Sequence, residues 1–179
     1  IQCCLVGSEM CIRDSTDADD TSISSTNLST IGAATTGTVT VTNAIAITGT
    51  TAEMIAALVT AETKVVVSDA AVTITNTPTI AELNAIAAKT TGVVTATLAA
   101  NSLANLGALT TEGTDAITIT VNDANEAALT AANLSTLGGK TAGTVTVTNA
   151  VAITGTTAEV TAALVTAGTL VVVSDAAVT

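Results

Sequence analysis

A gapless internal repeat runs through this chain. Residues Asn27–Thr73 recur as Asn133–Thr179 at an offset of 106 (133 − 27), and the two copies share stretches such as GTVTVTNA and VVVSDAAVT. The match extends back to Asp17–Asp20, which aligns with Asp123–Glu126. Long repeats of this kind are typical of architectures in which equivalent units stack, because one unit cannot bury its apolar face alone.

A shorter pattern, V-x-V-x-(N/D)-A, recurs within the long repeat. Its alternating apolar residues predict strands with one buried face. The copies are Val39–Ala44, Val65–Ala70, Ile119–Ala124, Val145–Ala150 and Val171–Ala176. We expect a degraded copy near residues 93–98 and a second, shorter extended piece at residues 45–47 and 151–153.

A hydroxyl residue followed three places later by Glu or Asn, and then by an apolar residue, predicts the start of a short helix with a capping box. The pairs are Ser24/Asn27, Thr50/Glu53, Thr79/Glu82, Ser102/Asn105, Thr130/Asn133 and Thr156/Glu159. The hydroxyl residues step by 26, 29, 23, 28 and 26 positions along the chain. Each step therefore spans one strand, one turn, one short extended piece and one helix.

These patterns predict an α/β fold in the form of a repeat solenoid, with parallel strands and short helices. We expect about six coils of roughly 26 residues in residues 16–179, without capping coils, and four coils in each 106-residue repeat. Val41, Val67, Val121 and Val147 should face one shared interior on neighbouring rungs. The plan is similar to that of leucine-rich repeats, although the leucine pattern of that family is absent.

The first fifteen residues break the repeat. The repeat predicts a strand equivalent to Ile117–Val121 at residues 11–15, but Arg13 and Ser15 stand where apolar side chains should point inward. Leu5–Ser15, LVGSEMCIRDS, resembles the translation of a transposon adapter used to prepare sequencing libraries. The resemblance implies that residues 1–15 are a disordered, non-native leader, that the native N-terminus is missing and that the chain is a fragment. All three cysteines lie in this leader.

Composition excludes several classes of function. The net charge is −11 with only four Lys and Arg residues, which argues against nucleic acid and anionic membrane surfaces as partners. No apolar run is long enough to insert into a membrane. The chain has no His, no P-loop and no dinucleotide-binding glycine motif, so we expect that it is not an enzyme.

The polar residue that ends each strand motif forms a column, which is the main candidate site. Its members are Asn43, Asp69, Asp123, Asn149 and Asp175. We expect these side chains to bond nearby backbone groups and form turns. The alternative is calcium held between coils, for which Asp69, Asp123 and Asp175 are the candidate ligands.

Two further sets of residues allow two interpretations each. Glu53, Glu82 and Glu159 are spaced for helix capping rather than for acid–base chemistry, and they should lie at helix N-termini. The outward threonines suit solvated strands, and a regular threonine face would instead indicate ice binding. These threonines are Thr40, Thr42, Thr120, Thr146 and Thr148. Their array is interrupted at Val66, Ser68, Asn122 and Val172.

The acidic, low-complexity Thr/Ala/Val-rich coils of residues 16–179 resemble the repeats of long bacterial surface proteins, often called adhesin-like. This resemblance implies a structural or adhesive segment of an extracellular or cell-surface protein, without catalysis. Its expected partners are neighbouring repeats of the same chain and an unidentified surface or matrix partner. The alternatives are a calcium-binding repeat module and an ice-binding threonine face.

Overall fold

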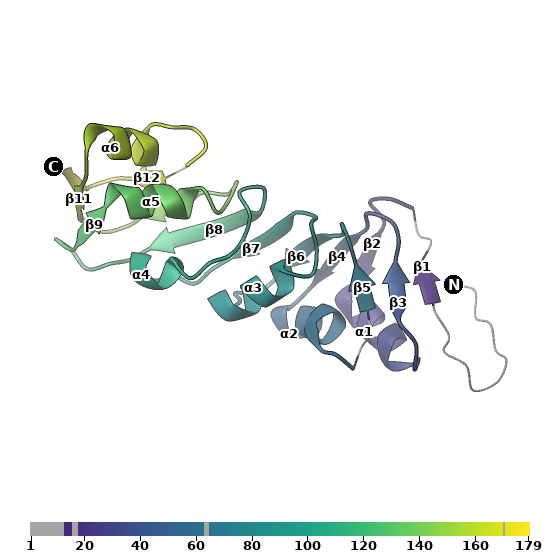
Figure 1. Cartoon of the computed structure of the whole chain (residues 1–179). Helices are drawn as coiled ribbons and strands as arrows, with labels where there is room; N and C mark the ends of the chain where they lie inside the picture. Colours follow the sequence, from purple (N-terminus) through teal and green to yellow (C-terminus); the bar gives the residue numbers. More distant parts are fainter. Residues whose placement is uncertain (1–12, 16–17, 63–64, 170) are drawn as a thin grey trace. The chain divides into compact units, whose positions relative to one another are not determined.

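The computed structural model describes residues 13–15, 18–62, 65–169 and 171–179. The fold is mixed α/β, with parallel strands in sheets and several short helices (Figure 1). The chain divides into two compact units, residues 1–77 with 82–95 and residues 78–81 with 96–179. The mixed α/β class and the parallel strands predicted from the repeat are thereby confirmed.

The first unit contains two parallel sheets, in the orders β1-β3-β5 and β2-β4-β6-β7. Its elements are β1 (Arg13–Ser15), β2 (Ser22–Ser24), α1 (Ser25–Ala33), β3 (Val39–Val41), β4 (Ala46–Gly49), α2 (Thr51–Met54), the π-helical turn η1 (Ile55–Val59), β5 (Val65–Val67) and β6 (Ala71–Ile74). Helix α3 (Ile80–Ala87) and strand β7 (Val94–Thr97) are divided between the units, and residues 82–87 and 94–95 belong to the first.

The second unit repeats this plan. It contains α4 (Leu103–Leu106), β8 (Ala116–Val121), β9 (Ala128–Thr130), α5 (Ala131–Gly138), β10 (Val145–Val147), β11 (Ala152–Thr154), α6 (Thr157–Leu164), β12 (Val171–Val173) and β13 (Ala177–Val178). Strands β8, β10 and β12 are neighbours in one sheet, and β9, β11 and β13 form another.

Strand register reproduces the sequence repeat. In the first unit Val39 pairs with Val65, and in the second Val145 pairs with Val171, so both pairs join residues 26 positions apart. The shorter strands of the first unit pair at offsets of 24 (46 − 22) and then 25 (71 − 46), in Ser22↔Ala46 and Ala46↔Ala71. The shorter strands of the second unit have the same two offsets. Equivalent residues of the two sequence copies therefore occupy equivalent rungs.

The inward valines are buried as the alternation predicts. Val41, Val67, Val121 and Val147 are all buried. Val41 pairs with Val67, and Val121 pairs with Val147, so each pair stacks on neighbouring rungs of one unit. Burying a side chain of this size contributes about 1.5 kcal/mol or more, so these rows are a main source of stability.

Five of the six predicted helix starts have the expected cap. Ser24, Thr50, Ser102, Thr130 and Thr156 are N-caps whose hydroxyls accept from the backbone N–H three residues later. Thr50 with Glu53 and Thr156 with Glu159 form complete capping boxes. Helix α3 begins at Ile80, directly after Thr79. The hydroxyl spacing in the sequence therefore places the helices correctly.

The degraded strand copy near residues 93–98 forms β7, but its partner differs from the one that the repeat implies. An equivalent copy would pair with β5, whereas Val94 and Thr95 pair with Val72 and Thr73 of β6. The step between the caps Thr79 and Ser102 is 23 positions rather than the usual 26, so the strand reaches a different register. In the second unit, Leu98 N donates to Thr118 O at 3.1 Å.

The last three residues of the leader form a strand. The expectation of disorder covers residues 1–15, of which residues 1–12 lie outside the described part of the chain and Arg13–Ser15 form β1. Arg13 pairs with Val39 as Ile119 pairs with Val145, so β1 occupies the rung where the repeat predicts a strand. Backbone pairing along a strand edge tolerates many side chains, which explains how this segment can pair. That residues 1–15 are foreign to the protein stays a prediction.

Thr-x-Gly turns lead into three strands and were not anticipated from the sequence. The hydroxyls of Thr35, Thr90 and Thr141 accept from the N–H of the glycine two residues later. A Cβ on Gly92 would lie 2.4 Å from the carbonyl oxygen of Ala70, and one on Gly143 would lie 2.3 Å from that of Ile117. Glycine is required at these two positions because the neighbouring backbone passes so close.

Candidate functional site

The structure brings the predicted Asn/Asp column together within each unit. Asp123, Asn149 and Asp175 each lie two residues after the last residue of β8, β10 and β12, which are neighbouring parallel strands. Asn43 and Asp69 follow β3 and β5 in the same way in the first unit. The three aspartates proposed as calcium ligands are thus divided, with Asp69 in one unit and the other two in the other.

The column residues bond mainly to the backbone. The amide Nδ2 of Asn149 donates to the carbonyl oxygen of Asp123 at 2.6 Å. The Oδ2 atom of Asp123 accepts from the N–H of Leu103, the first residue of α4, at 2.7 Å. Ser68 Oγ donates to Asp69 Oδ1 at 3.1 Å, and Asp175 is exposed. These contacts are of the kind expected for a turn-forming column.

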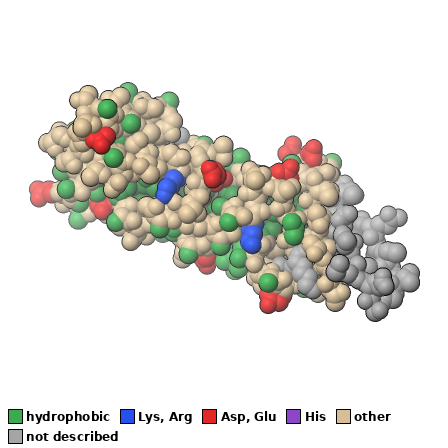
Figure 2. Space-filling view, in the orientation of Figure 1, with side chains coloured by type: hydrophobic (Ala, Val, Ile, Leu, Met, Phe, Trp, Pro, Cys, Tyr) green, Lys and Arg blue, Asp and Glu red, His purple; other side chains and the backbone are tan. Residues whose placement is uncertain are grey.

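Cation binding needs several oxygens directed at one point. Among the described residues, no three Asp, Glu, Cys or His side chains gather in a way that could hold a metal ion. On the face drawn in Figure 2, acidic and basic side chains cover only a small part of the described surface, and most of it is of other kinds. Calcium binding therefore gains no support from the side chains that the structure places.

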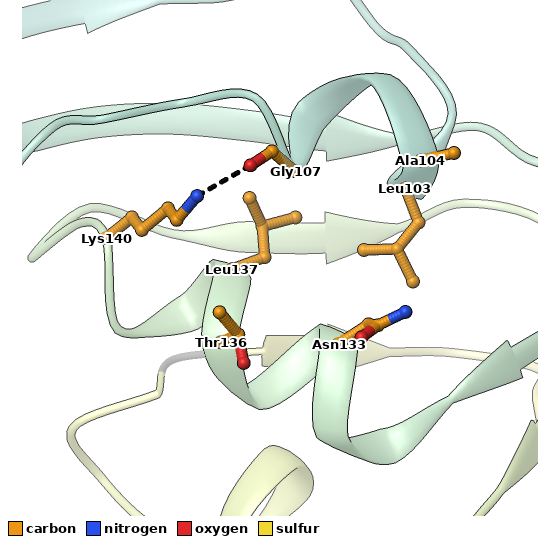
Figure 3. A pocket seen from close by; sticks show the side chains of 7 residues that line it. All are labelled: Leu103, Ala104, Gly107, Asn133, Thr136, Leu137 and Lys140. Carbon is orange, nitrogen blue, oxygen red and sulfur yellow. Dashed lines mark hydrogen bonds between the residues drawn. The ribbon is translucent and has the colours of Figure 1, made fainter.

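The second unit has two adjacent hollows beside α4, which share Leu103 and Ala104 as lining residues. Their volumes are about 220 and 190 Å³. The first is lined by Leu103, Ala104, Gly107, Asn133, Thr136, Leu137 and Lys140 (Figure 3). The second is lined by Leu103, Ala104, Asp123, Ala128, Leu129, Thr130 and Asn133. Asp123 thus connects the column to a surface hollow.

The one charged side chain that lines the first hollow, Lys140, is engaged with the protein backbone. Lys140 Nζ donates to the carbonyl oxygen of Gly107 at 2.7 Å (Figure 3). It also donates to the carbonyl oxygen of Leu109. These carbonyls lie at the carboxyl end of α4, where a cation is favourable. Helix α4 has four residues and α5 has eight.

The hollows have little capacity for chemistry. Both are smaller than the roughly 300–1,000 Å³ that is usual for small-molecule sites. Their linings combine leucines with an amide, hydroxyls and one lysine that donates to backbone carbonyls, and neither contains a pair of carboxylates. Such a lining suits ordered water or a small side chain better than a reacting substrate.

The glutamates that could have been acid–base groups instead cap helices. Glu53 Oε2 accepts from the N–H of Thr50 at 2.7 Å and from its hydroxyl at 2.9 Å, and Oε1 accepts from the hydroxyl of Thr26 at 2.8 Å. The pKa of Glu53 is lowered chiefly by the Thr50 N–H and then by the Thr26 and Thr50 hydroxyls. The Thr156 N–H, followed by its hydroxyl, lowers the pKa of Glu159.

Glu82 lies in the first turn of α3, where the spacing also predicts it. The bond from Thr26 to Glu53 joins neighbouring helices, α1 and α2, and the sequence pattern did not reveal it. A lowered pKa favours a permanently ionised carboxylate, which stabilises a helix N-terminus and is a poor proton donor near neutral pH.

The outward threonines are unevenly exposed. Thr42 and Thr148 are exposed, whereas Thr40, Thr120 and Thr146 are only partly exposed. The next rungs after Thr40 and Thr146 carry Val66 and Val172, which are 53% and 51% exposed. The same interruption occurs in both copies of the long repeat, so a valine breaks the row of threonines at the equivalent place in each unit.

Comparison of the chain with protein-family models, with curated proteins and with solved structures finds no match. No helix among the residues that the structure describes is both long and apolar enough to cross a membrane.

Proposed function

We propose that the chain is an α/β solenoid segment of a long extracellular or cell-surface repeat protein, and that it acts as a spacer, stalk or adhesive surface without catalysis. The observation that carries this proposal is the repeated register. Val39 pairs with Val65 in the first unit as Val145 pairs with Val171 in the second, and the shorter strands also pair at matching offsets. A chain that repeats its register can extend by adding coils.

The energetics of such a chain favour length over a single special site. Each coil buries its valine row against the next, so stability is a sum of nearest-neighbour contacts. The polar groups support the same interpretation, because Glu53, Glu159, Asp123 and Asn149 are used to bond backbone or hydroxyl groups. The partners proposed are neighbouring repeats of the same chain and an unidentified surface or matrix partner.

The origin of residues 1–15 forms a separate part of the proposal. We infer that this leader is foreign to the repeat, because its sequence resembles an adapter translation and its Arg13 and Ser15 replace inward apolar residues. The strand β1 shows only that three of its residues pair with β3. Replacing Arg13 and Ser15 with Ile and Val, as in Ile119 and Val121, should therefore stabilise the chain.

The solenoid is tested by lengthening the chain in phase. Residues 74–179 make up one full period of the long repeat, so one or two further copies can follow Thr179 without changing the repeat. Small-angle scattering should show the maximum dimension growing by about 19 Å for each copy, because four coils are spaced about 4.8 Å apart. The cross-sectional radius of gyration should stay constant.

A matched control carries the same added residues in shuffled order, which keeps composition and charge but removes the repeat. It should not extend at constant cross-section. If the in-phase chains instead thicken in cross-section at unchanged length, the coils do not stack in one direction and the proposed function fails.

A further inference from the structure

The surface formed by α6 and β13 in the second unit is more exposed than its equivalent in the first. Val178 is 48% exposed, whereas its equivalent Val72 is 0% exposed. Thr157 is exposed, but its equivalent Thr51 is only 5% exposed. Val165 is 75% exposed. We call Thr157, Val165 and Val178 the end face.

The first unit shows what covers this face when it is buried. Val72 and Thr73 pair with Val94 and Thr95 of β7, and Val72 N donates to Val93 O at 2.9 Å. These partners belong to residues 74–95, which follow Thr73, the residue that corresponds to Thr179. The covering segment is therefore a coil of the same protein type.

A specific polar contact accompanies this cover. Asn76 Oδ1 accepts from the N–H of Thr51 at 2.7 Å and from its hydroxyl at 2.8 Å, at the first residue of α2. A similar contact occurs in the second unit, where Asp123 accepts a hydrogen bond from the N–H of Leu103, the first residue of α4. Thr157 is the first residue of α6, and among the described residues no side chain accepts from its N–H.

We propose that the end face is a docking surface for a repeat coil with the sequence pattern of residues 74–98. The docked coil adds a parallel strand beside β13, as β7 does beside β6, and its asparagine accepts from the N–H and hydroxyl of Thr157. The exposed Val165 and Val178 are apolar, and covering them supplies the driving force. This inference rests on the proposed function, in which successive coils stack, and it names the contacts that join one coil to the next.

The test extends the full chain by one coil, a second copy of residues 74–107 placed after Thr179. Amide hydrogen exchange is measured at Thr157 and Val178, with Thr51 and Val72 as internal references that already have their cover. Exchange at Thr157 and Val178 should slow by about tenfold or more, toward the rates of the references. A control carries Asn76→Ala in the added copy only, and it should restore fast exchange at Thr157 while Val178 stays slow.

Unchanged exchange at Thr157 and Val178 in the extended chain overturns the docking proposal. Slowing at both sites that does not depend on the added asparagine also overturns the specific contact. Slow exchange at both sites in the unextended chain also overturns the proposal, because the face is then covered without an added coil. Small-angle scattering of the chains lengthened in phase separates these outcomes from failure of the proposed function. Those chains can extend at constant cross-section even if the added asparagine does not contact Thr157.

Discussion

A single buried hydroxyl connects two backbone segments, residues 115–117 and 141–143, in the second unit. Thr141 is 2% exposed, and its Oγ1 accepts from the N–H groups of Ile117 and Gly143, both at 2.8 Å. The same hydroxyl lies 2.9 Å from the carbonyl oxygen of Asp115, to which it can donate. A buried N–H that loses its acceptor costs about 1–3 kcal/mol, so this residue carries more stability than its size implies.

Thr141→Val keeps the shape of the side chain and removes the hydroxyl. We expect the free energy of unfolding to fall by about 2–4 kcal/mol, because two N–H groups lose their acceptor. Urea denaturation measures the change. Thr118→Val, at an exposed position of β8, is the matched control and should change stability by less than about 0.5 kcal/mol. Equal losses in both variants would contradict the assigned role of Thr141.

Two residues at equivalent positions have a left-handed backbone. Asp20 has φ of 61°, and Glu126, its equivalent in the second copy of the repeat, has φ of 64°. Their N–H groups donate to Ala44 O at 2.8 Å and Ala150 O at 2.7 Å, so a hydrogen bond holds each residue in this conformation. The left-handed conformation costs a non-glycine residue about 1–2 kcal/mol.

Glu126→Gly should therefore raise the free energy of unfolding by about 0.5–1 kcal/mol, even though glycine usually destabilises a chain. Chemical denaturation measures the difference. Ala124→Gly, two residues away, serves as the control and should lower stability. A loss of stability in Glu126→Gly as large as that of the control would show that the left-handed conformation carries no cost.

At the scale of elements, the helices are too short to be stable alone. They have four to nine residues, whereas isolated helices need about 12–15 residues even for favourable sequences. Caps and neighbouring coils must therefore hold them. The capping boxes of α2 and α6 have the same geometry, with Glu accepting from the N-cap N–H at 2.7 Å in both.

The pH dependence of stability follows from these boxes. The pKa values of Glu53 and Glu159 are lowered in the folded chain from the ordinary value of 4.5, first by the N–H of Thr50 and of Thr156. The unfolded chain thus binds protons more readily, so this stabilisation is present above pH 4.5 and is lost as pH falls through the lowered pKa values.

The double variant Glu53→Gln/Glu159→Gln should lose that part of the acid dependence, which denaturation at a series of pH values measures. Glu62→Gln, at an exposed turn position, is the matched control for loss of a carboxylate. If the double variant and the control have the same acid profile as the parent chain, the boxes do not contribute to stability.

At the scale of the whole molecule, both units bury rows of valines by stacking parallel strands on one another. In the second unit the polar column contributes contacts such as Asn149 to Asp123 O and Asp123 to Leu103 N, which link successive coils. The proposed function predicts that the melting temperature is the same with calcium and with a chelator, as measured by calorimetry. Magnesium is the control cation. A calcium-specific rise in the melting temperature would favour the calcium-binding alternative, because an ion bound only to the folded chain stabilises it.

The sequence alone determined which residues become strands and helix starts, and which valines are buried. Alternation and cap spacing are local properties, so Val41, Val121, Thr50 and Thr156 could be assigned without knowing their neighbours. The strand-end column was also predictable, since neighbouring parallel strands end at one edge.

Only the tertiary structure decided which backbone lies opposite each segment. It paired β7 with β6 and β1 with β3, and it directed Asn76 and Asp123 at the first residues of α2 and α4. The Thr-x-Gly turns belong to the same group, because Thr141 bonds Ile117 across 24 positions. Such contacts depend on the length of each coil and on the register it imposes, and no local pattern records where a distant backbone will lie.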